Sequence, residues 1–414
     1  MYTTRRFFLR NGALALAGTT AIPGFLVRSV MAQDARATRR RLVVIFQRGA
    51  ADGLNIVVPW REKNYYSMRP SIAIPQNRVL DLDGFFGLHP SLAGFKPLYD
   101  RGHLAIVHAA GSPDMTRSHF DAQDYMESGT PGVKSTQDGW LNRALQAEDL
   151  RRRQAQTAFR AVAVGPDVPL TLAGKVPAVA LNNVNNFTVG GHGPALSPAA
   201  SAFQAMYADS GDRIFHSAGD ETFDAVKMLR AADPAQYVPA PGVEYPNSEF
   251  GRNMRQMAQL LKANLGVEAV FTDVQGWDTH HSQGGVDGQL SNRLRDFSDS
   301  IAAFWRDLGD GAENVTLVTL SEFGRTAREN GTGGTDHGHA NAMFVLGGGV
   351  KGGKVYGRWP GLDNDQLNQG RDLALTTDYR QVLGEVVENS LGASNLGLVF
   401  PGAELAPKSF LRIV

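Results

Sequence analysis

The chain has 414 residues, of which 43% are hydrophobic, so it can bury a large core as one big domain or as two. It carries 41 basic and 41 acidic residues. This balance disfavours nucleic acid as the main partner, because phosphate binding usually requires a basic excess. The absence of cysteine excludes disulfide bonds, thiolate metal ligands and cysteine nucleophiles.

Residues 1–33 have the pattern of an export signal. The run RRFFLR at positions 5–10 fits the twin-arginine motif, and a weakly apolar stretch follows it. That stretch is too short and too polar for a stable membrane span. We therefore expect the twin-arginine translocase, which carries folded proteins and often ones already loaded with a metal or cofactor, to export the protein to the periplasm or the medium. The alternative is a disordered basic N-terminus.

Apolar runs and amphipathic segments alternate along the mature chain, residues 34–414. The expected strands are Leu42–Phe46, Leu104–His108, Phe159–Val164, Val267–Phe271, Val315–Leu320 and Ala342–Leu346. The expected helices are Ser118–Ser128, Trp140–Gln154, Ser248–Leu265, Gln289–Leu308 and Thr377–Leu391. This alternation predicts an α/β fold, a three-layer αβα sandwich with a mostly parallel central sheet. We expect an insertion or a lid within residues 133–246.

Ionisable side chains follow several of the predicted strands. They are Asp52, Asp278, His280, Glu322 and His337. Ligands in α/β folds bind beyond the carboxyl ends of the strands, so these five residues are expected to meet there. Carboxylates and imidazoles from separate parts of the chain are suitable ligands for one or two divalent cations, with zinc as one candidate.

Two of these signals also have simpler interpretations. Asp52 precedes a glycine, and Asp-Gly is an ordinary turn pair. Ser118 stands three residues before Asp121, a spacing typical of a helix N-cap. A hydroxyl at a helix N-terminus could also act as a nucleophile, and Thr116 is a second candidate for that role.

Several motifs together resemble one known family. They are the twin-arginine leader, RGAADGLN at 48–55, RSHFDAQDYMESG at 117–129, GWDTH at 276–280, SEFGRT at 321–326 and GTDHG at 334–338. The combination resembles an uncharacterised family of exported bacterial proteins, named only as a domain of unknown function. That family is classed in the alkaline phosphatase and sulfatase-like superfamily. The resemblance covers nearly all of residues 40–400.

The resemblance implies an alkaline phosphatase-like fold and a two-metal site. By this comparison Asp52 is similar to the first-strand aspartate of the superfamily, and Ser118 lies where its nucleophile would be. Asp278 and His280 resemble its Asp/His pair, and His337 resembles its final histidine.

The chain also departs from the superfamily pattern. Glu322 stands near the aspartate of an Asp-His dipeptide, but Phe323 stands where the histidine would be, so we expect one metal position to be weakened or lost. A formylglycine sulfatase is disfavoured because the chain has neither a cysteine nor the Ser-x-Pro-x-Arg or Ser-x-Ala-x-Arg motif.

The expected function is metal-dependent hydrolysis of a phosphate or sulfate ester of a small molecule or a glycan. The attacking group would be Ser118 or a metal-bound hydroxide, and Arg325 or Arg48 would stabilise charge on the transferred group. A non-catalytic exported protein that keeps the fold and binds a metal, a glycan or another protein is the alternative. A third interpretation is that the acidic and histidine residues only form buried hydrogen-bonded networks.

Overall fold

The computed structural model describes residues 40–149, 159–183, 236–263, 265–405 and 410–414. The expected export signal, residues 1–33, lies outside the described residues. So do residues 184–235, which make up much of the expected insertion within 133–246. Among the described residues, no helix combines the length and the apolar character needed to cross a membrane.

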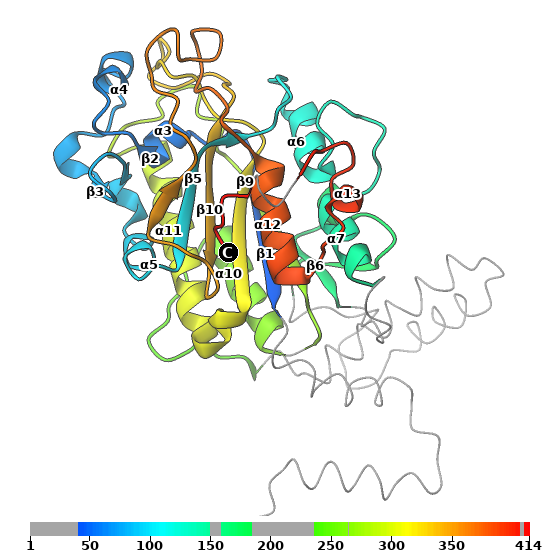
Figure 1. Cartoon of the computed structure of the whole chain (residues 1–414). Helices are drawn as coiled ribbons and strands as arrows, with labels where there is room; N and C mark the ends of the chain where they lie inside the picture. Colours follow the sequence, from blue (N-terminus) through cyan, green and yellow to red (C-terminus); the bar gives the residue numbers. More distant parts are fainter. Residues whose placement is uncertain (1–39, 150–158, 184–235, 264, 406–409) are drawn as a thin grey trace, which may run out of the picture. The chain divides into compact units, whose positions relative to one another are not determined.

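A mixed, mostly parallel sheet forms the centre of the unit that begins at Arg40 (Figure 1). Its strands are β1 (Arg41–Gln47), β5 (Leu104–Gly111), β6 (Ala161–Val164), β7 (Ala178–Leu181), β8 (Ala269–Val274), β9 (Val315–Ser321), β10 (Asn341–Gly347), β11 (Lys354–Tyr356) and β12 (Thr377–Asp378). They are ordered β11-β5-β10-β9-β1-β8-β6-β7, and β12 also pairs with β5. Within this sheet, β10 runs antiparallel to its neighbours β5 and β9.

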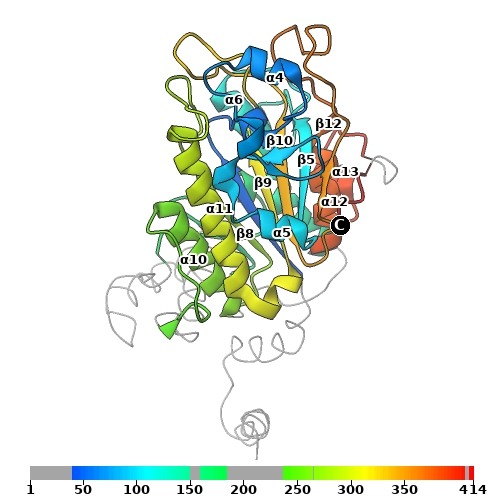
Figure 2. The ribbon, with the colours of Figure 1, turned by 90° about the vertical axis from the view of Figure 1, so that its left-hand side faces the viewer.

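Helices cover both faces of the sheet. The described α-helices are α3 (Gly53–Ile56), α4 (Lys63–Met68), α5 (Lys96–Asp100), α6 (His119–Ser128), α7 (Trp140–Asp149), α10 (Glu249–Lys262), α11 (Gln289–Leu308), α12 (Tyr379–Leu391) and α13 (Leu396–Val399). Figure 2 shows α10 and α11 on one side of the sheet and α12 on the other. A small second sheet consists of β2 (Val57–Val58), β4 (Gly87–Leu88) and β3 (Leu80–Asp81).

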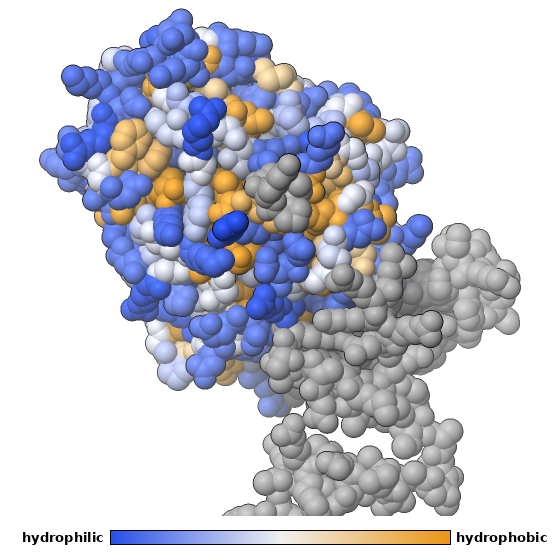
Figure 3. Space-filling view, viewed as in Figure 1, coloured by the Kyte–Doolittle hydropathy of each residue, from blue (hydrophilic) through white to orange (hydrophobic). Residues whose placement is uncertain are grey.

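The side chains of β1 show why the fold has three layers. Val43 and Ile45 join a core with α10 and α11, whereas Val44 and Phe46 join a second core with α7 and α12. Successive side chains of a strand point to opposite faces, so a strand covered on both faces must be apolar almost throughout. The predicted α/β sandwich is therefore confirmed. Figure 3, viewed from the same side as Figure 1, shows a mainly hydrophilic surface with scattered apolar patches.

The elements expected from the sequence are present, with shifted ends. The expected strands correspond to β1, β5, β6, β8, β9 and β10. Thr377 and Asp378 form β12 rather than the first turn of a helix, and Asp378 caps α12 by accepting a hydrogen bond from the Arg380 backbone N–H. The end of the helix expected over Trp140–Gln154 lies outside the described residues. Strands β6 and β7 come from the region of the expected insertion and extend the central sheet.

A fully buried histidine in β5 is held in its neutral form by the fold. His108 Nδ1 accepts a hydrogen bond from the Ala109 N–H at 2.9 Å, so Nε2 carries the proton and donates it to the Val57 carbonyl at 2.9 Å. The ring packs against Phe86 and Trp359. Burial lowers the pKa of His108 to about 4.

We predict that His108 makes the fold acid-sensitive. The unfolded chain takes up a proton at this ring near pH 6.5 while the folded protein does not, so the free energy of unfolding falls as the pH drops from about 6.5 to about 4. The loss due to this ring is roughly 3 kcal/mol. In urea unfolding at pH 7, 6, 5 and 4, His108→Gln should lose less stability over this range than the native protein. His281 is exposed and serves as the control. If the pH-dependent loss of stability were reduced equally in His281→Gln, His108 would not be the cause of the acid sensitivity.

Candidate metal centre

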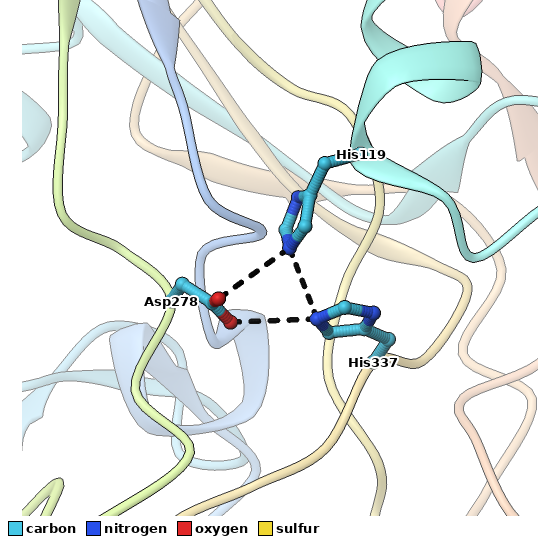
Figure 4. A group of neighbouring side chains, drawn as sticks. All are labelled: His119, Asp278 and His337. Atoms are coloured by element: carbon cyan, nitrogen blue, oxygen red, sulfur yellow. Dashed lines mark hydrogen bonds and ion pairs between the residues drawn. The ribbon is translucent and has the colours of Figure 1, made fainter.

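Three side chains from separate parts of the chain meet beyond the carboxyl ends of β8 and β9 (Figure 4). His119 opens α6, Asp278 follows β8, and His337 lies in the loop between β9 and β10. His119 Nε2 lies 3.0 Å from His337 Nε2 and 3.6 Å from Asp278 Oδ2, and His337 Nε2 lies 3.4 Å from Asp278 Oδ1. Residues of these types at these distances could hold a metal ion.

His280 adds a fourth donor atom. Its Nε2 lies 2.9 Å from His337 Nε2 and 3.0 Å from Asp278 Oδ1. The loop after β8 therefore places two candidate donors, two residues apart, at the centre. Three imidazoles and one carboxylate thus line the candidate centre, and within it the donor atoms of His119, Asp278 and His337 all lie within 4.8 Å of one another.

The outer nitrogen of each imidazole faces an oxygen. The pairs are His119 Nδ1 with Glu322 Oε1 at 2.8 Å, His280 Nδ1 with Asp336 Oδ1 at 3.1 Å, and His337 Nδ1 with the Arg117 carbonyl at 2.9 Å. Carbonyl oxygens and ionised carboxylates only accept hydrogen bonds, so each Nδ1 donates. In each neutral ring the unprotonated Nε2 then faces the candidate centre.

This arrangement suits a cation. Unprotonated imidazole nitrogens beside a carboxylate repel one another unless a positive charge lies among them. Metal-binding histidines characteristically donate their other N–H to a carboxylate or a carbonyl, as all three rings do here. A set of three nitrogen donors and one oxygen donor fits a divalent cation, and zinc accepts such ligands.

Neighbouring groups favour the ionised forms of Asp278 and Glu322. Burial alone would raise the pKa of Asp278, but the hydrogen bond and charge of Arg325 lower it below its usual value. Burial likewise opposes ionisation of Glu322, yet hydrogen bonds from His119 and Gln123 lower its pKa. Burial lowers the pKa of His337. At neutral pH both carboxylates are therefore ionised and His337 is neutral.

Glu322 and Asp52 lie outside the group of His119, Asp278 and His337. Glu322 Oε1 accepts hydrogen bonds from His119 Nδ1 and from the Gly49 backbone N–H, so it orients a ligand. The structure does not bring Asp52 into the group. Both of its carboxylate oxygens bind Arg69, at 2.6 Å and 3.0 Å, and both side chains are buried. Without Asp52, the buried Arg69 charge would lose its partner, at a high energetic cost.

Arg325 and Arg48 are both engaged by the protein itself. Arg325 is buried and donates to the carbonyls of Gly49, Ala50, Trp277 and Thr335, as well as to Asp278. Arg48 pairs with Glu127 and Asp273. Arg325 thus ties the loop after β1 to the loops that carry the ligands. A direct role for either residue toward a substrate stays a prediction.

Ser118 is the N-cap of α6, as the simpler interpretation predicted. Its exposed Oγ accepts from the Asp121 backbone N–H at 3.5 Å. The cap fixes the start of the helix, and the next residue is His119. The alternative role of Ser118 as a nucleophile stays a prediction, as does that of Thr116.

Sequence reasoning missed His119. It lies inside the motif at 117–129, but a lone histidine at the start of a helix has no distinctive spacing. Its position directly after the cap, on a helix that follows a buried strand, was the available signal. Phe323, which departs from the superfamily pattern, packs its ring 5.0 Å from that of His119 and 5.1 Å from that of His337. An apolar ring thus supports the two imidazoles from one side.

Gly49 allows the loop after β1 to approach the ligands closely. Its φ is +114°, and a Cβ there would lie 2.7 Å from the Asp278 backbone nitrogen. Only glycine combines this backbone conformation with such proximity.

We predict that Gly49→Ala weakens metal binding, because the added methyl group pushes the Asp278 backbone away. Gly84→Ala is the matched control, since Gly84 has φ +82° but a Cβ there would meet nothing within 4 Å. Both variants should lose roughly 1–2 kcal/mol through the unfavourable backbone conformation. Only Gly49→Ala should also lower the metal content measured by elemental mass spectrometry. Equal metal content in the two variants would contradict this role of Gly49.

Comparison with solved structures found similarity at low sequence identity. The C-terminal periplasmic domain of EcEptC from Escherichia coli, solved in complex with Zn, is 10% identical with a TM-score of 0.33, and the match covers 75% of this chain and 73% of that one. The PsFucS1 sulfatase from Pseudoalteromonas sp. is 11% identical with a TM-score of 0.36, and the match covers 95% and 78%. A phosphonate monoester hydrolase of Agrobacterium radiobacter is 9% identical with a TM-score of 0.35, and the match covers 88% and 78%.

Comparison with curated protein sequences found no match. The family resemblance seen in the motifs is confirmed at the level of the whole domain. The model of the family described as "Protein of unknown function (DUF1501)" matches residues 39–395, and the chain belongs to this family.

Proposed function

We propose that the protein is an exported hydrolase that uses a divalent cation to cleave phosphate or sulfate esters. The observation that carries the proposal is that three imidazoles, each with its outer N–H bound to an oxygen, lie within 3.6 Å of one carboxylate. The twin-arginine pattern supports export to the periplasm or the medium.

We propose that the centre binds one cation. Among the described residues, a single group of histidine and acidic side chains has the spacing of a metal site. Asp52, which a two-metal site would use, is occupied by Arg69. Phe323 supplies an apolar ring beside the centre instead of a further ligand.

The candidate centre is open to solvent. The side chains of His119 and His337 are 24% and 23% exposed, and that of Asp278 is 42% exposed. Structural zinc sites are closed by four protein ligands, whereas catalytic sites have three and keep a position for water or substrate. The four candidate donors reach the structural number, so it is their exposure alone that favours a reactive centre over a purely structural network.

The chemistry divides between the cation and the chain. A bound divalent cation acts as a Lewis acid and lowers the pKa of water. His119, His280, His337 and Asp278 would hold it. Glu322 and Asp336 fix the ring orientations through the outer nitrogens. Because the Oγ of Ser118 serves as a cap, we favour water over Ser118 as the attacking group.

The alternative is a non-catalytic exported protein that binds a metal, a glycan or another protein. The observation that favours it is that both arginines form ion pairs within the chain itself. Arg48 pairs with Glu127 and Asp273, and Arg325 pairs with Asp278. Neither guanidinium is free to bind an anionic substrate as the structure stands. Retained metal without turnover of any ester would support this alternative.

We predict that the native, mature protein purified without chelator contains about one divalent cation per chain, because one donor group is present. The double variant His280→Ala/His337→Ala should lose it, since two donors are removed. His281→Ala, which changes the exposed neighbour of His280, should retain it. The readout is elemental mass spectrometry alongside circular dichroism. A folded native protein that contains no cation and takes none up would overturn the proposal.

We predict that Ser118→Asn keeps most of the hydrolytic activity. Asparagine is as good an N-cap as serine but has no hydroxyl, so it preserves α6 while removing the candidate nucleophile. The test uses the metal-loaded protein on aryl phosphate, aryl sulfate and phosphonate monoesters, with Ser118→Ala as the variant that loses the cap. Abolished turnover in Ser118→Asn, with metal content unchanged, would instead identify Ser118 as the nucleophile.

A further inference from the structure

A buried ion pair lies behind the candidate metal centre. Asp52 and Arg69 are 1% and 0% exposed. Arg69 also donates to Asn55 Oδ1 at 2.7 Å and to the carbonyls of Thr326 and Ala327 at 2.8 Å and 2.9 Å. Every donor group of the guanidinium is thus directed at a fixed acceptor, so Asp52 is held in one place.

Gln283 connects this ion pair to the ligand-bearing loops. Its Nε2 donates to Asp52 Oδ2 at 2.7 Å. Its Oε1 accepts from the hydroxyls of Thr279 and Thr335, at 2.7 Å and 2.8 Å. Gln283, Thr279 and Thr335 are all buried.

Asp52 determines the direction of these hydrogen bonds. A carboxylate paired with Arg69 accepts hydrogen bonds, so Gln283 must turn its amide NH₂ toward Asp52. The amide oxygen then faces the two threonines, and both hydroxyls must donate to it. The charge of Asp52 therefore orients the Gln283 amide and, through it, the hydroxyls of Thr279 and Thr335.

The two threonines stand beside the candidate ligands. Thr279 lies between Asp278 and His280 in the chain, and Thr335 lies two residues before His337. The Thr335 backbone N–H also donates to the Thr279 carbonyl at 3.1 Å. Gln283 thereby fastens the loop after β8 to the loop after β9, which together carry three of the four donors.

We infer that Asp52 and Gln283 are positioning residues of the metal centre, which act through Thr279 and Thr335 to hold the Asp278–His280 loop against the loop that carries His337. The inference rests on the proposed metal site but not on its catalytic activity. It assigns Asp52 an effect on metal binding without direct contact with the cation. Replacing outer partners of metal ligands typically lowers metal affinity 10- to 100-fold.

Thr279→Val tests the inference, because valine keeps the shape of threonine but cannot donate to Gln283. The measurement is the Zn²⁺ dissociation constant of the full mature protein, determined by competition with a chromophoric chelator. We expect about a tenfold weaker affinity in Thr279→Val and a near-native affinity in Thr279→Ser, which restores the hydroxyl. A merely structural role for Thr279 would change the free energy of unfolding without changing this constant.

Thr272→Val is the matched control. Thr272 is buried in β8, and its hydroxyl donates to the Val164 carbonyl within the sheet at 2.9 Å rather than to the ligand loops. It should lose stability but keep its Zn²⁺ affinity. Native affinity in Thr279→Val, or equal weakening in Thr272→Val, overturns the positioning role alone. Absence of Zn²⁺ binding by the native protein overturns both this inference and the proposed function.

Discussion

The mutual repulsion of unprotonated imidazole nitrogens is the constraint on which the candidate centre depends. His119 Nε2 and His280 Nε2 lie 3.0 Å and 2.9 Å from His337 Nε2, so with every Nδ1 donating outward the three Nε2 atoms face one another at close range. The outer hydrogen bonds to Glu322, Asp336 and the Arg117 carbonyl prevent the rings from turning away. The surrounding structure therefore holds the three rings in an arrangement that is unfavourable without a cation. A bound cation would stabilise it.

The sheet brings these groups together because β8, β1 and β9 are parallel neighbours. Their carboxyl ends lie at one edge, where Gly49, Asp278 and Glu322 follow their strands. Arg325 joins the three loops by donating to the Gly49 and Trp277 carbonyls from its own position beyond β9. His119 comes from a different part of the sheet. It lies on α6, which follows β5, and β10 separates β5 from β9. Only a folded chain can supply it.

The sequence predicted most of the fold and part of the centre, for identifiable physical reasons. Strands buried on both faces must be apolar, so β1 and β9 were visible as apolar runs. Asp278 and His280 were visible because ligand types two residues apart follow a strand. Asp52 looked equally suitable, but its partner Arg69 lies 17 residues away at the C-cap of α4, and no local sequence pattern indicates that pairing.

The burial of Arg325 changes how a charged substrate would meet the centre. Its guanidinium binds Asp278, the one carboxylate among the four candidate donors, while the other three donors are imidazoles. The positive charge of Arg325 thus already balances the negative charge of Asp278. Asp278 therefore offsets little of the charge of a divalent cation. In the proposed hydrolase the cation would retain most of its positive charge toward solvent, where an anionic ester approaches. Arg325 would then favour catalysis through the charge of the ligand set, without touching the substrate.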